Sequence, residues 1–245
     1  MSKIPKKAPA SAIAVYSGGM DSTVMLSAML EQGIEVKGAL TIDYGQKHRK
    51  EIEAAVEICA EMGIEHRIAD LRGIASLFGR SGLTDSETEV PDGHYEAESM
   101  KQTVVPNRNM ILISVATAWA ITKEAEAVAY AAHSGDHAIY PDCREEFASA
   151  LDDAIRLCDW SSVWLYRPFV NLSKQAIATE GARLASPLGK TWSCYKGGAL
   201  HCGKCGTCIE RREAFHLAKI EDPTRYASDA PSVALLVEKN WRLSD

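Results

Sequence analysis

The stretch Ser17-Gly18-Gly19-Met20-Asp21-Ser22 constrains this chain more than any other part of it. It follows an apolar run, residues 12–16, that predicts a strand, and it precedes a predicted helix over residues 23–32. Two adjacent glycines let the backbone amides close around an anion, and the positive end of the helix dipole faces the same point. Nearby hydroxyl groups add further donors. The pattern predicts a phosphate-binding loop between a strand and a helix.

The same loop lacks the lysine that a γ-phosphate-transferring P-loop carries, because Gly-Gly-Met-Asp-Ser-Thr does not fit G-x-x-x-x-G-K-[ST]. Asp21 can either cap the helix or hold a magnesium ion that is already bound to phosphate. The alternative at this point is a Gly-Gly turn that joins a strand to a capped helix and binds nothing.

Predicted strands and helices alternate along the rest of the chain. This order indicates an α/β fold with a doubly wound, parallel, five-stranded sheet and right-handed crossovers. In such sheets ligands bind at the carboxyl ends of the strands. The predicted strands cover residues 12–16, 34–42, 64–68, 127–132 and 163–166, and the predicted helices cover residues 23–32, 50–62, 110–121, 145–158 and 174–184.

Several polar residues follow the predicted strands and are expected beside the phosphate loop. Arg108, just before a strongly apolar helix, is well placed to bind an anion, and a solvated arginine is the equal alternative. His133 and His137 are left without a role. The acidic stretch 81–100 contains no lysine or arginine. It is interpreted as a disordered surface loop in the free protein, or as a lid over the substrate.

Four of the seven cysteines, Cys194, Cys202, Cys205 and Cys208, lie close together near the C-terminus. Glycines after Cys202 and Cys205 allow tight turns that bring thiolates together, so the spacing predicts a closed, structural zinc site with one ion per chain. An iron–sulfur cluster is the alternative, although the sequence after Cys208 does not continue the ferredoxin pattern. Cys59 and Cys158 are expected to be buried on apolar helix faces. Cys143 is expected in a strand-end loop, either as a reactive thiol or as a packed one.

Composition limits the classes of function. The 245 residues are 46% hydrophobic and 24% charged, with a net charge of −6, so no overall basic field attracts nucleic acid. The N-terminus has no apolar core of a signal peptide, and we expect a cytoplasmic protein without a membrane anchor. The predicted organisation is a flexible tail (1–11), a nucleotide-binding domain (12–185), a zinc-binding segment with a helix (186–228) and a C-terminal tail (229–245).

The phosphate loop resembles the SGGxDS loop of the PP-loop ATP pyrophosphatases (adenine nucleotide alpha hydrolase-like fold). With the Asp43-Tyr44-Gly45-Gln46 strand end and the motifs at 106–109, 140–144 and 193–208, the chain resembles the 7-cyano-7-deazaguanine synthases from about residue 12 to Tyr226. The resemblance implies conversion of 7-carboxy-7-deazaguanine, ammonia and ATP to the nitrile preQ0 in queuosine biosynthesis, with Mg²⁺ on the ATP and a homodimeric enzyme. Direct contact with nucleic acid is not expected.

The resemblance and the loop chemistry together give candidate roles. Ser17, Asp21 and Arg108 are the candidate catalytic residues. Asp142 is the candidate acceptor for the N1–H and 2-amino group of the base, and capping of the helix near Arg144 is the alternative. The expected ATP-binding residues are Tyr16, Ser17, Gly18, Gly19, Met20, Asp21, Ser22, Thr23, Val24, Met25 and Leu26. The expected substrate-binding residues are Tyr44, Gln46, Asn107, Arg108, Tyr140, Asp142 and Arg144.

Three other functions fit part of the pattern. A PP-loop ligase that transfers the activated deazaguanine acid to another amine, such as a protein N-terminus, would keep nearly all of these motifs. A PP-loop tRNA thiolase would share the ATP chemistry, but it usually needs an RNA-binding appendage and a basic surface, and neither is seen. A zinc-ribbon binding module would explain the cysteines and leave the phosphate loop without a purpose.

Overall fold

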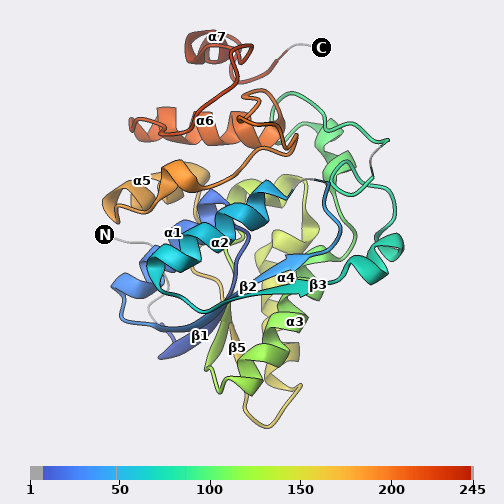
Figure 1. Ribbon diagram of the computed structural model, residues 1–245, viewed down its shortest axis with the longest axis vertical. Helices are drawn as coiled ribbons and strands as arrows, with labels where there is room; N and C mark the ends of the chain where they lie inside the picture. Colours follow the sequence, from blue (N-terminus) through green and yellow to red (C-terminus); the bar gives the residue numbers. More distant parts are fainter. Residues whose placement is uncertain (1–7, 48, 86, 244–245) are drawn as a thin grey trace.

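The computed structural model describes residues 8–47, 49–85 and 87–243, which form an α/β fold around one parallel sheet (Figure 1). The order of the strands is β3-β2-β1-β4-β5, and every neighbouring pair is parallel. The predicted doubly wound, five-stranded parallel sheet is therefore confirmed. The strands are β1 (Ser11–Val15), β2 (Glu35–Asp43), β3 (His66–Asp70), β4 (Ala127–Ala129) and β5 (Trp164–Tyr166).

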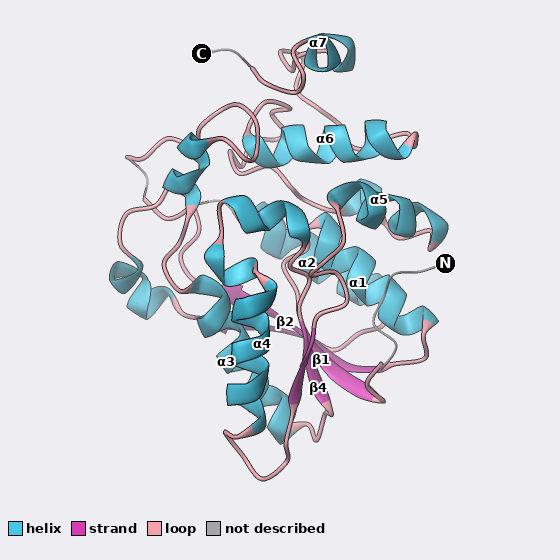
Figure 2. Cartoon of the chain, turned by 180° about the vertical axis from the view of Figure 1, so that it is seen from behind, coloured by secondary structure: helices cyan, strands magenta, loops and turns pink. Residues whose placement is uncertain are grey.

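Helices cover both faces of the sheet, as Figures 1 and 2 show from opposite sides. Successive side chains of a strand point to opposite faces, so β1 supplies Ala12 and Ala14 to one apolar core and Ile13 to the other. The first core contains residues of α1 (Met20–Glu31), α2 (Lys50–Met62) and α5 (Lys174–Arg183). The second contains residues of α3 (Arg108–Thr122) and α4 (Glu145–Arg156).

The strand order places the crossover reversal at β1. The chain leaves β1 toward β2 on one side, and β4 pairs with β1 on the other side. A crevice forms at such a reversal, beyond the carboxyl ends of the strands, because the helices that follow the two neighbouring strands lie on opposite faces of the sheet. The phosphate loop directly follows β1 and therefore lies at this point.

Three helices near the C-terminus are stacked at one end of the molecule (Figure 1). The helix α6 (Gly206–Ala218) packs beside α5, and α7 (Val233–Glu238) lies beyond it. Leu236 of α7 is buried with Ile209 and Trp241. The predicted domain boundaries stay a prediction. Residues 1–7 of the predicted N-terminal tail lie outside the described residues, and β1 already begins at Ser11.

The acidic stretch 81–100 is packed against the rest of the molecule, so the expectation of a disordered surface loop is wrong for its described residues. Leu83, Tyr95 and Met100 are buried, and the Gly93 amide donates a hydrogen bond to the Lys204 carbonyl at 3.0 Å. The aromatic and apolar side chains among its acidic neighbours give the stretch a buried face. The short 3₁₀ helices are η1 (Arg72–Phe78), η2 (Glu98–Thr103), η3 (Ser134–Ala138), η4 (Pro141–Cys143) and η5 (Leu188–Lys190).

The prediction that Cys158 is a buried helix residue is also wrong. The helix α4 ends at Arg156, and Cys158 lies exposed in the turn before β5. Cys59 and Cys143 are buried. Among the described residues, no helix combines the length and the apolar character required to cross a bilayer.

Candidate active site

The phosphate loop is closely packed against the start of α2. Gly18 has a φ of +78°, and a Cβ atom there would lie 2.3 Å from the Glu51 carbonyl oxygen and 2.7 Å from the Ala55 nitrogen. Only glycine satisfies both the left-handed conformation and this close approach. Gly19 is the N-cap of α1 and has no side chain, and the Thr23 amide is the first to bond back into the helix, at 3.1 Å from the Gly19 carbonyl. The backbone amides between Gly19 and Thr23, in the first turn of α1, precede this bond and are left for a ligand.

Hydroxyl groups hold the loop in this shape. Ser17 Oγ accepts a hydrogen bond from the Gly19 amide at 3.2 Å and lies 3.1 Å from Ser22 Oγ. Thr23 Oγ1 donates to the Gly19 carbonyl at 2.8 Å and lies 3.0 Å from the Tyr16 hydroxyl. These internal hydrogen bonds order the loop.

A cavity opens above this loop, at the carboxyl ends of β1, β2 and β4. Of the expected ATP-binding residues, six line it: Tyr16, Ser17, Gly19, Met20, Asp21 and Ser22. The other five lie outside the lining: Gly18, Thr23, Val24, Met25 and Leu26. The last four are fully buried, because the inner face of α1 packs on the sheet.

A cluster of buried and half-buried charges lies beside the phosphate loop in the cavity. Lys174 Nζ is 2.7 Å from Asp21 Oδ2 and 3.3 Å from Glu210 Oε2, and His133 Nε2 lies 3.2 Å from the same ammonium. Asp136 adds a carboxylate that accepts a hydrogen bond from the Tyr95 hydroxyl at 2.8 Å. Asp21 lies in the first turn of α1 without capping it, so of its two predicted roles the helix cap is wrong.

These contacts shift the ionisation of the pair at the loop. Burial lowers the pKa of Lys174, but Asp21 and Glu210 raise it by more, so the ammonium form is held. Burial raises the pKa of Asp21, and Lys174 and His133 lower it by more, so the carboxylate form is held as well. Both members of the pair are therefore charged at neutral pH.

Arg108 lines the same cavity but has different neighbours from Lys174, mainly tyrosines. It is the first residue of α3 and interacts electrostatically with the Tyr44 hydroxyl, and its guanidinium carbon is 5.9 Å from the centre of the Tyr140 ring. Tyr195 also faces the guanidinium. Within residues 8–47, 49–85 and 87–243, no carboxylate forms an ion pair with Arg108. A partly buried cation without a counter-charge is suited to an anionic ligand.

Three of the seven expected substrate-binding residues line the cavity: Tyr44, Gln46 and Arg108. Tyr140 is buried behind Arg108, where its hydroxyl lies 2.6 Å from Thr103 Oγ1. Asn107 and Arg144 are exposed outside the cavity.

Asp142 also lies outside the cavity lining. Its Oδ2 accepts the Asn109 amide at 3.0 Å, and the Asn109 side chain donates to the Asp142 carbonyl at 3.1 Å. Asp142 therefore caps the start of α3, whereas the helix considered from the sequence was the one near Arg144. The remaining acidic cavity residue, Glu51, is half-buried, and burial raises its pKa to about 7 despite the opposing effect of Arg108.

The four clustered cysteines meet as predicted. Their sulfur atoms lie within 4.8 Å of one another, an arrangement that can hold a metal ion. Backbone amides of Lys196 and Cys202 donate to Cys194 Sγ, each at 3.4 Å, and the Cys205 amide donates to Cys202 Sγ at 3.3 Å. Such donors stabilise thiolates, the form in which cysteine binds metals.

This cysteine segment also forms one wall of the cavity. The Trp192 amide donates to the Gly18 carbonyl of the phosphate loop at 3.0 Å, and Tyr195, Thr207 and Glu210 line the cavity. Arg211 is fully buried and donates to Thr191 Oγ1 at 2.8 Å and to the Leu188 carbonyl at 3.0 Å. The cysteine segment is thereby tied to the phosphate loop.

Comparison with known proteins agrees with this geometry. Residues 11–219 match the protein family described as queuosine biosynthesis protein QueC. The chain belongs to this family. It is 52% identical over 218 residues to the 7-cyano-7-deazaguanine synthase of Rhizobium meliloti, and the match covers 87% of this chain and 91% of that protein. It is 51% identical over 215 residues to the synthase of Methanoregula boonei, with 88% and 98% covered.

A third relative is 7-cyano-7-deazaguanine synthase 2 of Colwellia psychrerythraea, 47% identical over 215 residues, with 88% of this chain and 98% of that protein covered. The resemblance drawn from the motifs is thus confirmed. Membership of the QueC family indicates that the cavity is an active site. Several residues that line the cavity were not assigned a role from the sequence. These are Glu51, Tyr95, Asp136, Lys174, Tyr195 and Glu210.

Proposed function

We propose that this enzyme is an ATP-dependent ligase that converts 7-carboxy-7-deazaguanine and ammonia to 7-cyano-7-deazaguanine through an acyl adenylate and an amide. One observation carries the proposal. A phosphate loop with open amides and a guanidinium without a carboxylate partner, among the described residues, line the same cavity. The two features match the two anions of the first step, the triphosphate of ATP and the carboxylate of the base.

The first half of the reaction activates the acid. A carboxylate is a poor acyl donor because oxide would have to leave. Its oxygen attacks the α-phosphorus of ATP, which forms the acyl adenylate and releases pyrophosphate into the loop at residues 17–22. Ammonia then attacks the acyl carbon, AMP leaves with one carboxyl oxygen, and the amide remains after loss of a proton.

The second half removes the other oxygen. The amide oxygen attacks the α-phosphorus of a second ATP, and pyrophosphate leaves again. Loss of AMP, which now carries the amide oxygen, together with the two nitrogen-bound protons gives the nitrile. Two ATP molecules thus yield two AMP and two pyrophosphate per nitrile, and the same loop and cation serve both halves.

Each step is assigned to particular residues of the cavity. Arg108 binds the substrate carboxylate and stabilises the charge that develops at the α-phosphorus. Ser17 and the amides beyond Gly19 hold the departing pyrophosphate. Asp21, fixed by Lys174 at 2.7 Å, is the residue that would hold the magnesium ion of bound ATP. Tyr44 and Gln46, at the end of β2, are proposed to contact the base.

We also propose a structural zinc ion, a cytoplasmic location and a homodimer. Four cysteine thiolates suit zinc, with one ion per chain and no position left for water, so the ion would be structural. Ligation at these four sulfurs would fix the segment that contacts Gly18. Reduced thiols of this kind suit the cytoplasm, and the exposed apolar residues Val233, Leu235 and Val237 of α7 suit a homodimer.

The test uses 7-carboxy-7-deazaguanine labelled with ¹⁸O in both carboxyl oxygens, with magnesium ATP and ammonium. We expect unlabelled nitrile by mass spectrometry and AMP that carries the label, in a ratio of two AMP to one nitrile. Formation of ADP, or of nitrile with unlabelled AMP, would contradict the α-phosphorus mechanism. Labelled AMP with the amide as final product would support the activation steps and point to another acceptor.

A further inference from the structure

We infer that Glu51 is the residue that selects the base, by accepting hydrogen bonds from the N1–H and 2-amino group of the deazaguanine ring. This inference rests on the proposed function and names the part of the cavity that recognises its substrate. The ring presents two donors side by side on this edge, and one ionised carboxylate accepts both. The acceptor has to line the cavity, which excludes Asp142 because it lies outside and caps α3.

Among the described residues, four carboxylates line the cavity, and three of them already contact other groups. Asp21 and Glu210 both contact the Lys174 ammonium. Asp136 accepts the Tyr95 hydroxyl at 2.8 Å and the His133 amide at 3.3 Å. Glu51 is the remaining one, and within the described part of the chain its side chain has neither a hydrogen bond nor an ion pair.

The backbone holds Glu51 firmly at this place. It lies in the first turn of α2, and that turn packs directly on Gly18, where the Glu51 carbonyl oxygen occupies the space that a Cβ atom would need. The position of its backbone is therefore fixed relative to the phosphate loop. A residue anchored in this way can set the register between the base and the α-phosphorus.

Its surroundings suit a flat, polar ring. The Glu51 carboxyl interacts electrostatically with Arg108 and Tyr195 without forming an ion pair with Arg108 among the described residues. The rings of Tyr44, Tyr95 and Tyr195 also line this part of the cavity. A deazaguanine acid has donors at one edge and a carboxylate at another, so Glu51 and Arg108 match its two polar ends, with aromatic faces between them.

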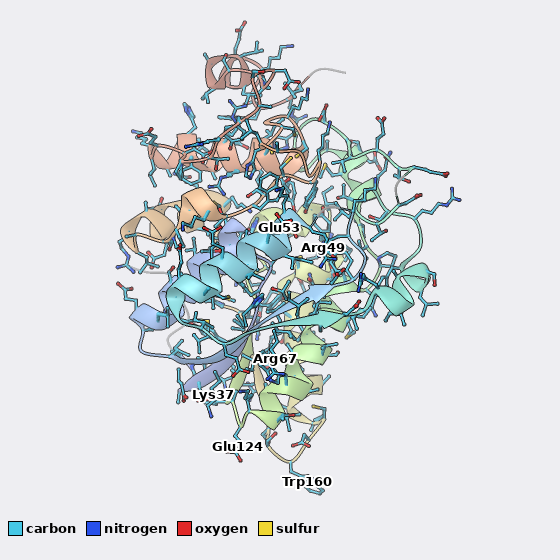
Figure 3. The ribbon with its side chains drawn as sticks, viewed as in Figure 1. Lys37, Arg49, Glu53, Arg67, Glu124 and Trp160 are labelled. Carbon is cyan, nitrogen blue, oxygen red and sulfur yellow. The ribbon has the colours of Figure 1, made fainter. Side chains whose placement is uncertain are left out.

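The experiment compares two bases and two glutamates. The bases are 7-carboxy-7-deazaguanine and the analogue that lacks the 2-amino group. The variant is Glu51→Gln, which has nearly the same shape and replaces one acceptor by a donor. The matched control is Glu53→Gln, two residues along the same helix, whose exposed side chain pairs with Lys50 at 3.2 Å (Figure 3).

In the unmodified enzyme, loss of the 2-amino group should raise KM about tenfold to 100-fold, because an acceptor is left unpaired. In Glu51→Gln the KM for the natural base should rise by a similar factor, kcat and the KM for ATP should stay within about threefold, and the penalty for the missing amino group should fall below about threefold. Glu53→Gln should behave as the unmodified enzyme does.

Two results would overturn the inference: a full amino-group penalty in Glu51→Gln, or a rise in the KM for ATP instead of the base. Glu51→Asp, which keeps the carboxylate, should retain most of the discrimination and guards against a folding defect in the amide variant. Failure of the proposed function looks different, because the unmodified enzyme would then make no nitrile. In that case equilibrium dialysis of the two bases against both proteins still decides the role of Glu51.

Discussion

The two cations of the cavity differ in what the protein does with their charge. Lys174 contacts two carboxylates and a histidine, so its charge is used inside the protein. Arg108 lies among Tyr44, Tyr140 and Tyr195 and has no carboxylate ion pair within the described residues. Burial of a charge has a high free-energy cost unless the charge is paired. The difference indicates that Lys174 organises the site and that Arg108 is kept for an anionic ligand.

One segment contacts both the phosphate loop and the surroundings of Arg108. The Trp192 amide donates a hydrogen bond to the Gly18 carbonyl, and Tyr195 faces Arg108. Cys194, one of the four clustered cysteines, lies between Trp192 and Tyr195 in the sequence. A change at the cysteine cluster should therefore affect both parts of the cavity, whereas a change at either cation should affect one.

The largest effect is expected from Cys205→Ser. Metal content should fall from about one ion per chain to near zero, and with it binding free energy on the order of 10 kcal/mol. The segment should then lose its hold on Gly18, so the KM for ATP and the KM for the base should both rise and the unfolding midpoint should fall. Elemental analysis, thermal unfolding and steady-state kinetics measure these effects.

Cys158→Ser is the matched control, because Cys158 is exposed and lies outside the cluster. It should keep the metal, the unfolding midpoint and both KM values. A Cys205→Ser protein that lost its metal but kept both KM values would show that the segment does not support the cavity.

The second prediction removes the paired cation. Lys174→Met leaves the half-buried Asp21 and the buried Glu210 without their common cation, so the free energy of unfolding at pH 8 should fall by about 3–5 kcal/mol. Urea unfolding of both proteins measures this difference.

The loss should depend on pH in a defined direction. In the native protein the pKa of Asp21 is lowered, so its contribution to stability is present above its ordinary pKa and disappears as the pH falls through the lowered value. Without Lys174, burial would raise both carboxyl pKa values, and the neutral forms would be favoured at low pH. The difference between the two proteins should therefore be smaller at pH 5 than at pH 8, and an equal or larger difference at pH 5 would contradict this explanation.

Local sequence patterns were sufficient for the fold class and for the strand, loop and helix around Gly18 and Gly19. Alternating apolar runs that end at glycines indicated the order of strands and helices along the chain, and in a parallel sheet the loops that follow the strands lie at one edge. The Gly18-Gly19 pair could be interpreted because its chemistry is contained in six consecutive residues. The cysteine cluster was predicted for the same reason, since its spacing is short.

The charge cluster could not be predicted from the sequence because its residues come from distant elements. Lys174 is 153 residues from Asp21, and no local pattern connects them. Asp142 shows the opposite difficulty. Its position near a strand end suggested a ligand, whereas its partner, the Asn109 amide, is 33 residues away and is brought close only by tertiary packing. Local sequence shows which groups are available and seldom shows which are already bound to each other.

The smallest of the three effects is expected at Arg108, the cation without a carboxylate partner among the described residues. Arg108→Ala removes a charge that no carboxylate of the described residues balances, so we expect little change in the unfolding midpoint. If the charge is kept for the substrate carboxylate and the α-phosphorus, kcat/KM for the base should fall about 100-fold to 1000-fold. Arg67→Ala, at an exposed arginine on β3, is the control and should leave both quantities unchanged (Figure 3). A large fall in stability with little loss of kcat/KM would show that Arg108, like Lys174, acts inside the protein.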